Sequence, residues 1–512
     1  MNRRKNALTD LIGSLSMAEK RHFSLFSAAF SKKENKSLYV KLFELLDGKV
    51  SEPSELETEF TPMALAKTKQ RLYTNLLKGL RVFYEGMSVE VDIQNMLTEI
   101  EILYKRALPE QANELLSKSL ALANDHEKFG LVLQLLKWEK RINIVVDAPL
   151  RSQPEIADEE RSTLAKLIQI STLESIYGRI MEFKRLYGYA KGDLKNQLEI
   201  ETVGSEDMPL LEDCQSNEAR FYHNFINSIY HWMIYEHKQA YLFSENLINP
   251  GSSTILPSIH ISALLQHITS SVCIGEFKTA LQGIELSEAY IDQYHLNQSP
   301  TYNTLMFAYH ATYQLIIYNY MGRKNKLRDA IKTTEAKLKL YENTLSLELR
   351  QILMGNLMNA YVGIGDIKSA DEIWDSIFNK QTKTLRRDIY ADLYLFRLFS
   401  LLHNKTYVLL PSAALSASRF YKKFDDAKEV YQVELPISLL LTKNIDYENP
   451  AAFAKVLKEI RAIIQKFISG LKGADNFQEH YSRYLIWIDS LLDNEPYSKA
   501  AAVWYSGRSK SN

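Results

Sequence analysis

Histidine and cysteine are the residues in this chain best suited to metal binding or nucleophilic chemistry. His223 and His231 are eight residues apart, and His260 and His267 are seven apart. On a helix each pair shares a face but lies two turns apart, too far for one zinc ion without other ligands. Cys273 lies in an apolar stretch, which favours a buried thiol over a nucleophile. The sequence also contains no glycine-rich phosphate loop and no His-Glu-x-x-His motif. We therefore expect no catalytic residues, no metal, no cofactor and no enzymatic activity.

Basic residues near the N-terminus form a pattern that suits binding rather than catalysis. At 100° per residue, Lys67, Arg71, Lys78 and Arg81 fall within about 80° of arc on a helix, opposite a set of leucines. Residues 1–85 hold 15 Lys/Arg and 10 Asp/Glu, whereas the whole chain has 62 of each. Two interpretations stay open. The stripe is either a solvated face or a docking surface for nucleic-acid phosphates or an acidic partner.

Long helices are the elements that must position these residues. Gly (19) and Pro (13) are scarce for 512 residues, and no period-two alternation of a strand is present. Apolar residues recur at spacings of three and four, for example at Leu173, Ile176, Ile180, Phe183 and Tyr187. The sequence therefore predicts an all-α protein.

The N-terminal segment shows helix start signals of its own. Ser16 and Glu19 fit a capping box, which predicts a helix starting at Met17. Further helices are expected over Leu38–Leu46, after Pro53, and from Pro62 to about Tyr84.

The strongest motif in the chain lies near residue 365. It consists of Leu357, Tyr361, Gly365, Ala370 and Trp374. Gly365 can adopt the positive φ that ends a helix, and Ala370 is small enough for two helices to cross closely. The two aromatic side chains would fill the space beside that crossing.

This motif resembles the tetratricopeptide (TPR) family, in which antiparallel helix pairs stack along the chain. The pattern recurs more weakly at Gly275 and Ala280, at Ala240 and at Ala112. Spacing is irregular, whereas a regular TPR array repeats every ~34 residues. The resemblance implies a TPR-like α-α superhelix, a solenoid of antiparallel helix pairs with lengthened helices. An irregular helical bundle is the alternative.

Four segments are expected along the chain. Residues 1–85 form a mildly basic helical unit, residues 86–200 the first helical repeats, residues 201–505 the TPR-like repeats, and residues 506–512 a disordered tail. The acidic, Gly- and Pro-containing stretch of residues 199–213 marks the best internal boundary.

Cysteine content and hydrophobicity also predict the cellular compartment of the protein. Two cysteines, Cys214 and Cys273, give no disulfide framework and suit a reducing environment. Asp10 interrupts the apolar stretch after the basic N-terminus, and no apolar run approaches ~18 residues. We expect a cytoplasmic protein without membrane contact.

The expected function is that of an interaction scaffold with a protein or peptide partner in the groove of the helical stack. In the resembled family the positions of Asn356 and Asn359 line that groove, and Trp232 and Tyr235 are candidate anchors. Solvent-exposed filler for the asparagines and ordinary packing for the aromatics are the alternatives. A second functional hypothesis is a nucleic-acid-associated regulator that uses the basic N-terminal unit.

Overall fold

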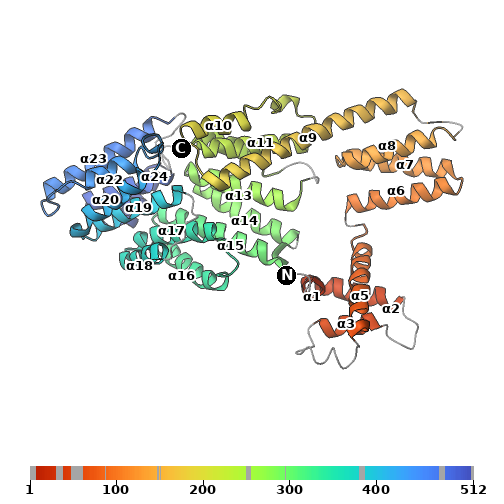
Figure 1. Cartoon of the computed structure of the whole chain (residues 1–512), viewed down its shortest axis with the longest axis horizontal. Coiled ribbons are helices and arrows are strands. Elements are labelled where there is room, and N and C mark those ends of the chain that lie inside the picture. The colour runs from red at the N-terminus through yellow and green to blue at the C-terminus, as the bar shows by residue number, and fades with distance from the viewer. Residues whose placement is uncertain are drawn as a thin grey trace. The chain divides into compact units, whose positions relative to one another are not determined.

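A computed structural model describes residues 7–29, 38–47, 62–86, 88–146, 149, 151–249, 255–294, 296–379, 387–471 and 479–508. All regular elements in these ranges are helical, namely 24 α-helices and three short 3-10 helices (Figure 1). The predicted all-α class is confirmed. The helix expected after Pro53 lies outside the described residues.

Contacts divide the chain into two compact units, residues 1–165 and 166–512. The division falls inside the long helix α9 (Gln153–Tyr187). The boundaries expected at residues 85 and 200 stay predictions. At the C-terminus, helix α25 (Tyr497–Arg508) includes residues 506–508, the start of the tail that the sequence predicts to be disordered. Residues 509–512 lie outside the described part.

The first unit contains two groups of helices, each with its own apolar core. The first group comprises α1 (Ala7–Ser14), α2 (Met17–Ala29), α3 (Leu38–Leu46) and α5 (Pro62–Phe83), packed around residues such as Phe23, Leu42 and Leu72. The second comprises α6 (Val89–Lys105), α7 (Pro109–Asp125) and α8 (Phe129–Ile142), which pack on each other and on Ile156 of α9.

The predicted capping box is present at the start of α2. The Ser16 N–H donates to Glu19 Oε2 (2.6 Å), and the Glu19 N–H donates to Ser16 Oγ (3.2 Å). Two otherwise unpaired N–H groups are thereby satisfied, which explains why the helix begins at Met17.

The second unit consists mainly of consecutive helices, and from α11 to α20 each helix packs on the next one in the chain. They are α10 (Asp193–Glu201), α11 (Asn217–Met233), α12 (His237–Glu245), α13 (Pro257–Cys273), α14 (Phe277–Gln293), α15 (Pro300–Tyr320), α16 (Lys324–Leu340), α17 (Leu347–Ile364), α18 (Ile367–Asn379), α19 (Arg387–His403), α20 (Leu410–Tyr421), α21 (Ala427–Val430), α22 (Glu434–Leu441), α23 (Pro450–Ser469), α24 (Glu479–Leu492) and α25, with 3-10 helices η1 (Leu211–Asp213), η2 (Leu296–Gln298) and η3 (Tyr407–Leu409). Helices α11 to α20 form five consecutive pairs, from α11 with α12 to α19 with α20. In each of the first four pairs, the first helix contacts its own partner and also the first helix of the next pair.

One residue with positive φ ends the first helix of each pair. These residues are Tyr235 (φ 64°), Gly275 (φ 81°), Gly322 (φ 62°), Gly365 (φ 85°) and Lys405 (φ 54°). Five positions later a side chain is buried against the partner helix, at Ala240, Ala280, Leu327, Ala370 and Leu410. The predicted positive φ of Gly365 and Gly275 is confirmed. The same turn also occurs without glycine, for example at Tyr235. The sequence has no glycine to mark the turn in such a repeat.

The last two helices fold back onto the stack. Helix α24 packs on α13, and α25 packs on α15 and α17. The Tyr320 hydroxyl donates to the Glu479 carbonyl, and the Phe277 ring stacks on Tyr505 with ring centroids 5.9 Å apart. The C-terminal helices therefore cover part of the first-helix surface that an open groove would expose.

Candidate functional site

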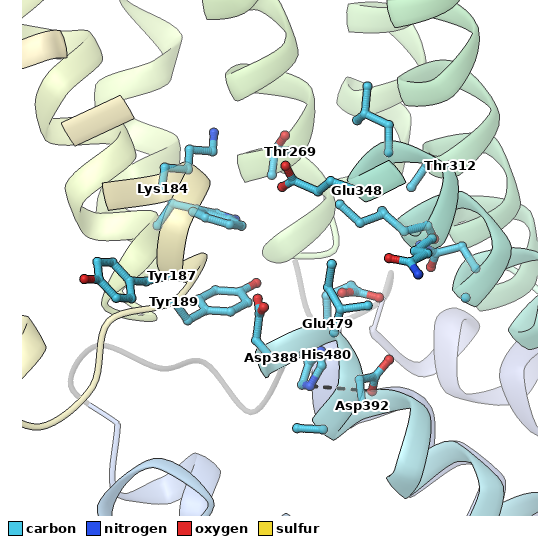
Figure 2. Close-up of a pocket in the computed structure, with 18 of the residues that line it drawn as sticks. Lys184, Tyr187, Tyr189, Thr269, Thr312, Glu348, Asp388, Asp392, Glu479 and His480 are labelled. Atoms are coloured by element: carbon cyan, nitrogen blue, oxygen red, sulfur yellow. Dashed lines mark hydrogen bonds and ion pairs between the residues drawn. The ribbon is translucent and has the colours of Figure 1, made fainter. Parts of the chain in front are cut away.

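A cavity of about 740 Å³ lies among the helices of residues 166–512. The end of α9 and the segment after it form one side, and α11, α13, α15, α17, α19, α21, α22 and α24 contribute the rest (Figure 2). Its volume lies within the range of ~300–1,000 Å³ that is typical of ligand sites.

Three stacked rings form what we call the aromatic wall, Tyr189, Trp232 and Tyr235. The Tyr189 ring lies 4.6 Å from the Trp232 ring and 4.2 Å from the Tyr235 ring, centroid to centroid. The Ala190 N–H donates to the Met233 carbonyl (2.8 Å), which ties the segment after α9 to the end of α11. Trp232 and Tyr235 thus come from the end of α11, whose backbone is bonded to the segment that carries Tyr189.

Tyr235 adopts an unusual backbone conformation for a large side chain. Its φ of 64° lies in the left-handed region, which costs a non-glycine residue roughly 1–2 kcal/mol. The ring is 5% exposed, and Lys191 Nζ lies 4.9 Å from its centroid. Glycine stands at the equivalent turn after α13, α15 and α17, and Lys405 (φ 54°) at the one after α19. Strain of this kind is often kept where a side chain has a functional position.

Four carboxylates form what we call the acidic floor, Asp388, Asp392, Glu434 and Glu479. The starts of α19, α22 and α24 carry them into the cavity, and Figure 2 shows Asp388, Asp392 and Glu479 near His480. Asp392 accepts hydrogen bonds from Arg483 (2.6 Å) and the Tyr484 hydroxyl (2.9 Å).

Glu434 is the most deeply placed carboxylate of the floor, at 3% exposure. Its Oε1 accepts a hydrogen bond from the Tyr481 hydroxyl (2.8 Å), and its Oε2 has no hydrogen-bond partner. The Tyr431 hydroxyl and the Arg483 Nε, both in buried residues that line the cavity, also lack partners. Unsatisfied buried polar atoms are rare in folded proteins, so their concentration here points to a missing partner.

Burial governs the protonation of the groups around the floor. It raises the pKa of Glu479, lowers the pKa of Lys191, and lowers the pKa of His480 to about 4. Burial alone would also raise the pKa of Asp392, but the charge of Arg483 holds that pKa below its usual value. His480 is therefore neutral at physiological pH, and Asp392 is ionised.

Three of the four predicted partner-binding residues line this cavity, namely Trp232, Tyr235 and Asn356. Asn359 is not among the lining residues, and its amide donates to the Gly355 carbonyl (3.1 Å). The Asn356 amide donates to the Ile352 carbonyl (2.9 Å). The structure thus brings three candidates together, and their binding role stays a prediction.

The repeat motif occupies the positions that its spacing predicts. Leu357, Tyr361 and Ala370 are buried, and the Arg397 guanidinium lies 4.8 Å from the Trp374 ring centroid. Gly365 donates its N–H to the Val362 carbonyl (2.9 Å) at the end of α17. These residues hold helices together and do not face the cavity.

The basic stripe lies on α5 in the first unit. Lys67, Arg71, Lys78 and Arg81 are all exposed, while Leu72 is fully buried on the other side of the helix. The predicted amphipathic helix is confirmed. Its role as a docking surface stays a prediction.

Three of the four histidines singled out in the sequence, and both cysteines, are buried. His223, His260 and His267 are buried, and burial lowers the pKa of each. Cys273 is a buried free thiol, as predicted. Among the described residues, no group of three or more His, Cys, Asp or Glu is placed to hold a metal ion.

Sequence reasoning missed the acidic floor. Its members come from three helix starts that are about 45 residues apart in the chain, and carboxylates at such distances form no local pattern.

A search of the described helices for a span long and apolar enough to cross a bilayer finds none. No protein-family model matches this chain, and no curated protein matches it significantly.

Proposed function

We propose that this chain is a TPR-like interaction scaffold, and that its cavity holds a short segment of a partner protein. The pairwise contacts from α11 to α19 support the TPR-like part of the proposal, because each helix contacts its partner and the next pair. The superhelical path of such a stack belongs to the same proposal.

The cavity is the single observation that carries the binding role. It combines an aromatic wall, which suits apolar side chains, with charged and amide groups that suit a peptide backbone. Unpaired atoms of Tyr431, Glu434 and Arg483 offer both donors and acceptors to an occupant. Because α24 and α25 pack on the first helices of the stack, the occupant meets a cavity rather than an open groove.

Photo-crosslinking from one helix tests this proposal. Tyr309 lines the cavity, whereas Tyr318 on the same helix does not, and both are partly buried. Benzoylphenylalanine at position 309 should crosslink a defined partner peptide in cells, and the same residue at position 318 should not. Equal crosslinking from both positions, or none from 309, would contradict the proposal.

A second proposal is that α5 contacts nucleic acid. The observation in its favour is the exposure of all four basic side chains on one face. A row of exposed cationic groups suits the phosphate backbone of a nucleic acid.

A further inference from the structure

Helix α5 carries five basic residues and no acidic residue over its 22 positions. Lys67 and Arg71 are four residues apart, and Lys78 and Arg81 are three apart, so like charges are neighbours on the helix surface. Such neighbours weaken a helix, and a face that is only solvated usually mixes both signs of charge. In the described part of the chain, none of these four cations is paired with a carboxylate. The pattern therefore favours an anionic ligand.

Two uncharged side chains, Gln70 and Thr74, belong to the same face of α5. At 100° per residue, they and the four cations fall within about 100° of arc, and all six side chains are exposed. The Thr74 hydroxyl donates to the Gln70 carbonyl (3.0 Å), so the methyl group of Thr74 is the part left for a ligand. Along the helix axis, these two positions lie between Lys67 and Lys78. Uncharged groups flanked by cations suit a helix that contacts bases at its centre and phosphates around it.

Helices α2 and α3 hold the opposite face of α5. Leu72 and Leu76 on that face are fully buried, and both helices pack against α5. A Cβ added at Gly79 would lie 3.1 Å from the Phe23 ring of α2, so the two helices cross closely there. The basic face therefore points away from the core of its helical group, on a helix whose orientation that core fixes.

Duplex DNA suits this face better than RNA or an acidic protein segment does. A helix with its side chains is about 10–12 Å wide, which matches the ~12 Å width of the DNA major groove. The major groove of an RNA duplex is too narrow for side chains to reach the bases. Lys67 and Arg81 are about 21 Å apart along the helix axis, the length of about six base pairs. A glutamine amide can pair with adenine N6 and N7, and a threonine methyl can contact that of thymine.

We infer that α5 lies in the major groove of duplex DNA and recognises its sequence. Gln70 contacts an adenine, Thr74 contacts a nearby thymine, and the four cations contact the phosphates around them. This inference rests on the proposed contact of α5 with nucleic acid, and it names the ligand and the mode of recognition.

Selection by the full chain from 20-base-pair duplexes with a randomised centre tests the inference. Wild type should bind its selected sequence at least tenfold more tightly than a shuffled duplex. Gln70→Ala and Thr74→Ala should each weaken binding to the selected sequence about tenfold and leave binding to the shuffled duplex unchanged.

Helix α6 offers a matched pair of control variants, Gln94→Ala and Thr98→Ala. Both side chains are exposed at the same spacing, and the Thr98 hydroxyl donates to the Gln94 carbonyl (3.1 Å), as at Thr74. Both control variants should bind the selected sequence as wild type does.

Base analogues identify the groove that is contacted. At the adenine whose preference Gln70→Ala abolishes, 7-deazaadenine removes the major-groove acceptor N7. This analogue should weaken binding by wild type and leave binding by Gln70→Ala unchanged. The analogue 2,6-diaminopurine alters the minor groove at the same position and should have little effect. The opposite pattern would show contact in the minor groove and contradict the inference.

The outcomes separate the inference from the proposed nucleic-acid contact. Salt-dependent binding without sequence preference, or a preference that both alanine variants keep, overturns the inference and leaves the contact with nucleic acid in place. Equal or tighter binding to a single strand or an RNA duplex of the selected sequence also overturns it. If wild type binds no nucleic acid, the nucleic-acid proposal fails together with the inference. Binding of polyglutamate instead would assign the face to an acidic protein segment.

Discussion

At the scale of single residues, several side chains that line the cavity destabilise the folded state. Tyr235 holds a strained backbone, Glu434 is buried and Glu479 is half-buried, and neither carboxylate forms an ion pair within the described part of the chain. Binding sites commonly keep such features, because groups that await a ligand are poorly satisfied without it. Substitutions that satisfy them should stabilise the free protein.

Glu479→Gln should therefore raise the free energy of unfolding at pH 7, by about 1 kcal/mol. Burial raises the pKa of Glu479 in the folded state, so the folded state holds the proton more tightly than the unfolded state does. The ionised carboxylate destabilises the fold increasingly as the pH rises from about 4. Urea unfolding at pH 4 and pH 7 measures the difference, and exposed Glu285→Gln is the control. A variant less stable than wild type at pH 7 would show that the carboxylate is already compensated.

Gly365→Ala should destabilise the second unit by about 1 kcal/mol. A methyl group at this position meets no atom within 4 Å, so the whole effect comes from the positive φ of 85°. Gly178→Ala is the matched control, since it lies inside α9 with open space around it and should gain about 0.5–1 kcal/mol. Equal effects at the two positions would refute the conformational explanation.

At the scale of helices, the sequence predicted both the turn and the small residue where glycine ends the first helix, but only the alanine at Ala240. Gly275 and Gly365 were visible, whereas Tyr235 makes the same turn and has no turn signature. After Gly322, Leu327 occupies the position that alanine takes in the repeats at Ala280 and Ala370. The acidic floor was beyond reach because tertiary packing alone brings together the starts of α19, α22 and α24.

The basic face of α5 gives a prediction at this scale. Charge reversal of Lys67, Arg71, Lys78 and Arg81 to Glu should abolish binding to a fluorescein-labelled 20-base-pair DNA. Wild-type affinity should fall with salt at a log–log slope of about −3 to −4 for four phosphate contacts. Reversal of Arg328, Lys332, Lys337 and Lys339, which are exposed on α16, matches the charge change. Fluorescence anisotropy that shows no binding, or binding insensitive to salt, would leave α5 as a solvated face.

At the scale of the whole molecule, buried neutral histidines make the second unit sensitive to acid. Burial lowers the pKa of His237 to about 3 and that of His310 and His480 to about 4. Unfolded histidine has a pKa of about 6.5, so between these values the unfolded state binds more protons. The stabilisation is complete above pH 6.5 and is lost as the pH falls towards 4.

His237→Phe should reduce this acid sensitivity, because phenylalanine cannot take up the proton. Each such histidine contributes up to about 1.4 kcal/mol per pH unit below pH 6.5. Urea midpoints between pH 7.5 and 4.5 measure the slope for wild type and variant. Identical slopes would mean that His237 does not stay neutral in the folded protein.

The central claim is that the cavity holds the partner segment, and Gly355→Leu tests it most directly. Gly355 lines the cavity on α17 with room for a side chain, since an added Cβ would lie 4.0 Å from Leu393. Leucine there should fill the cavity without unfolding the helix. Exposed Gly130→Leu on α8 is the control. Calorimetry with the segment crosslinked at position 309 should show affinity at least tenfold weaker, about 1.4 kcal/mol, for Gly355→Leu and unchanged for Gly130→Leu. Wild-type affinity in a folded Gly355→Leu variant would contradict the claim.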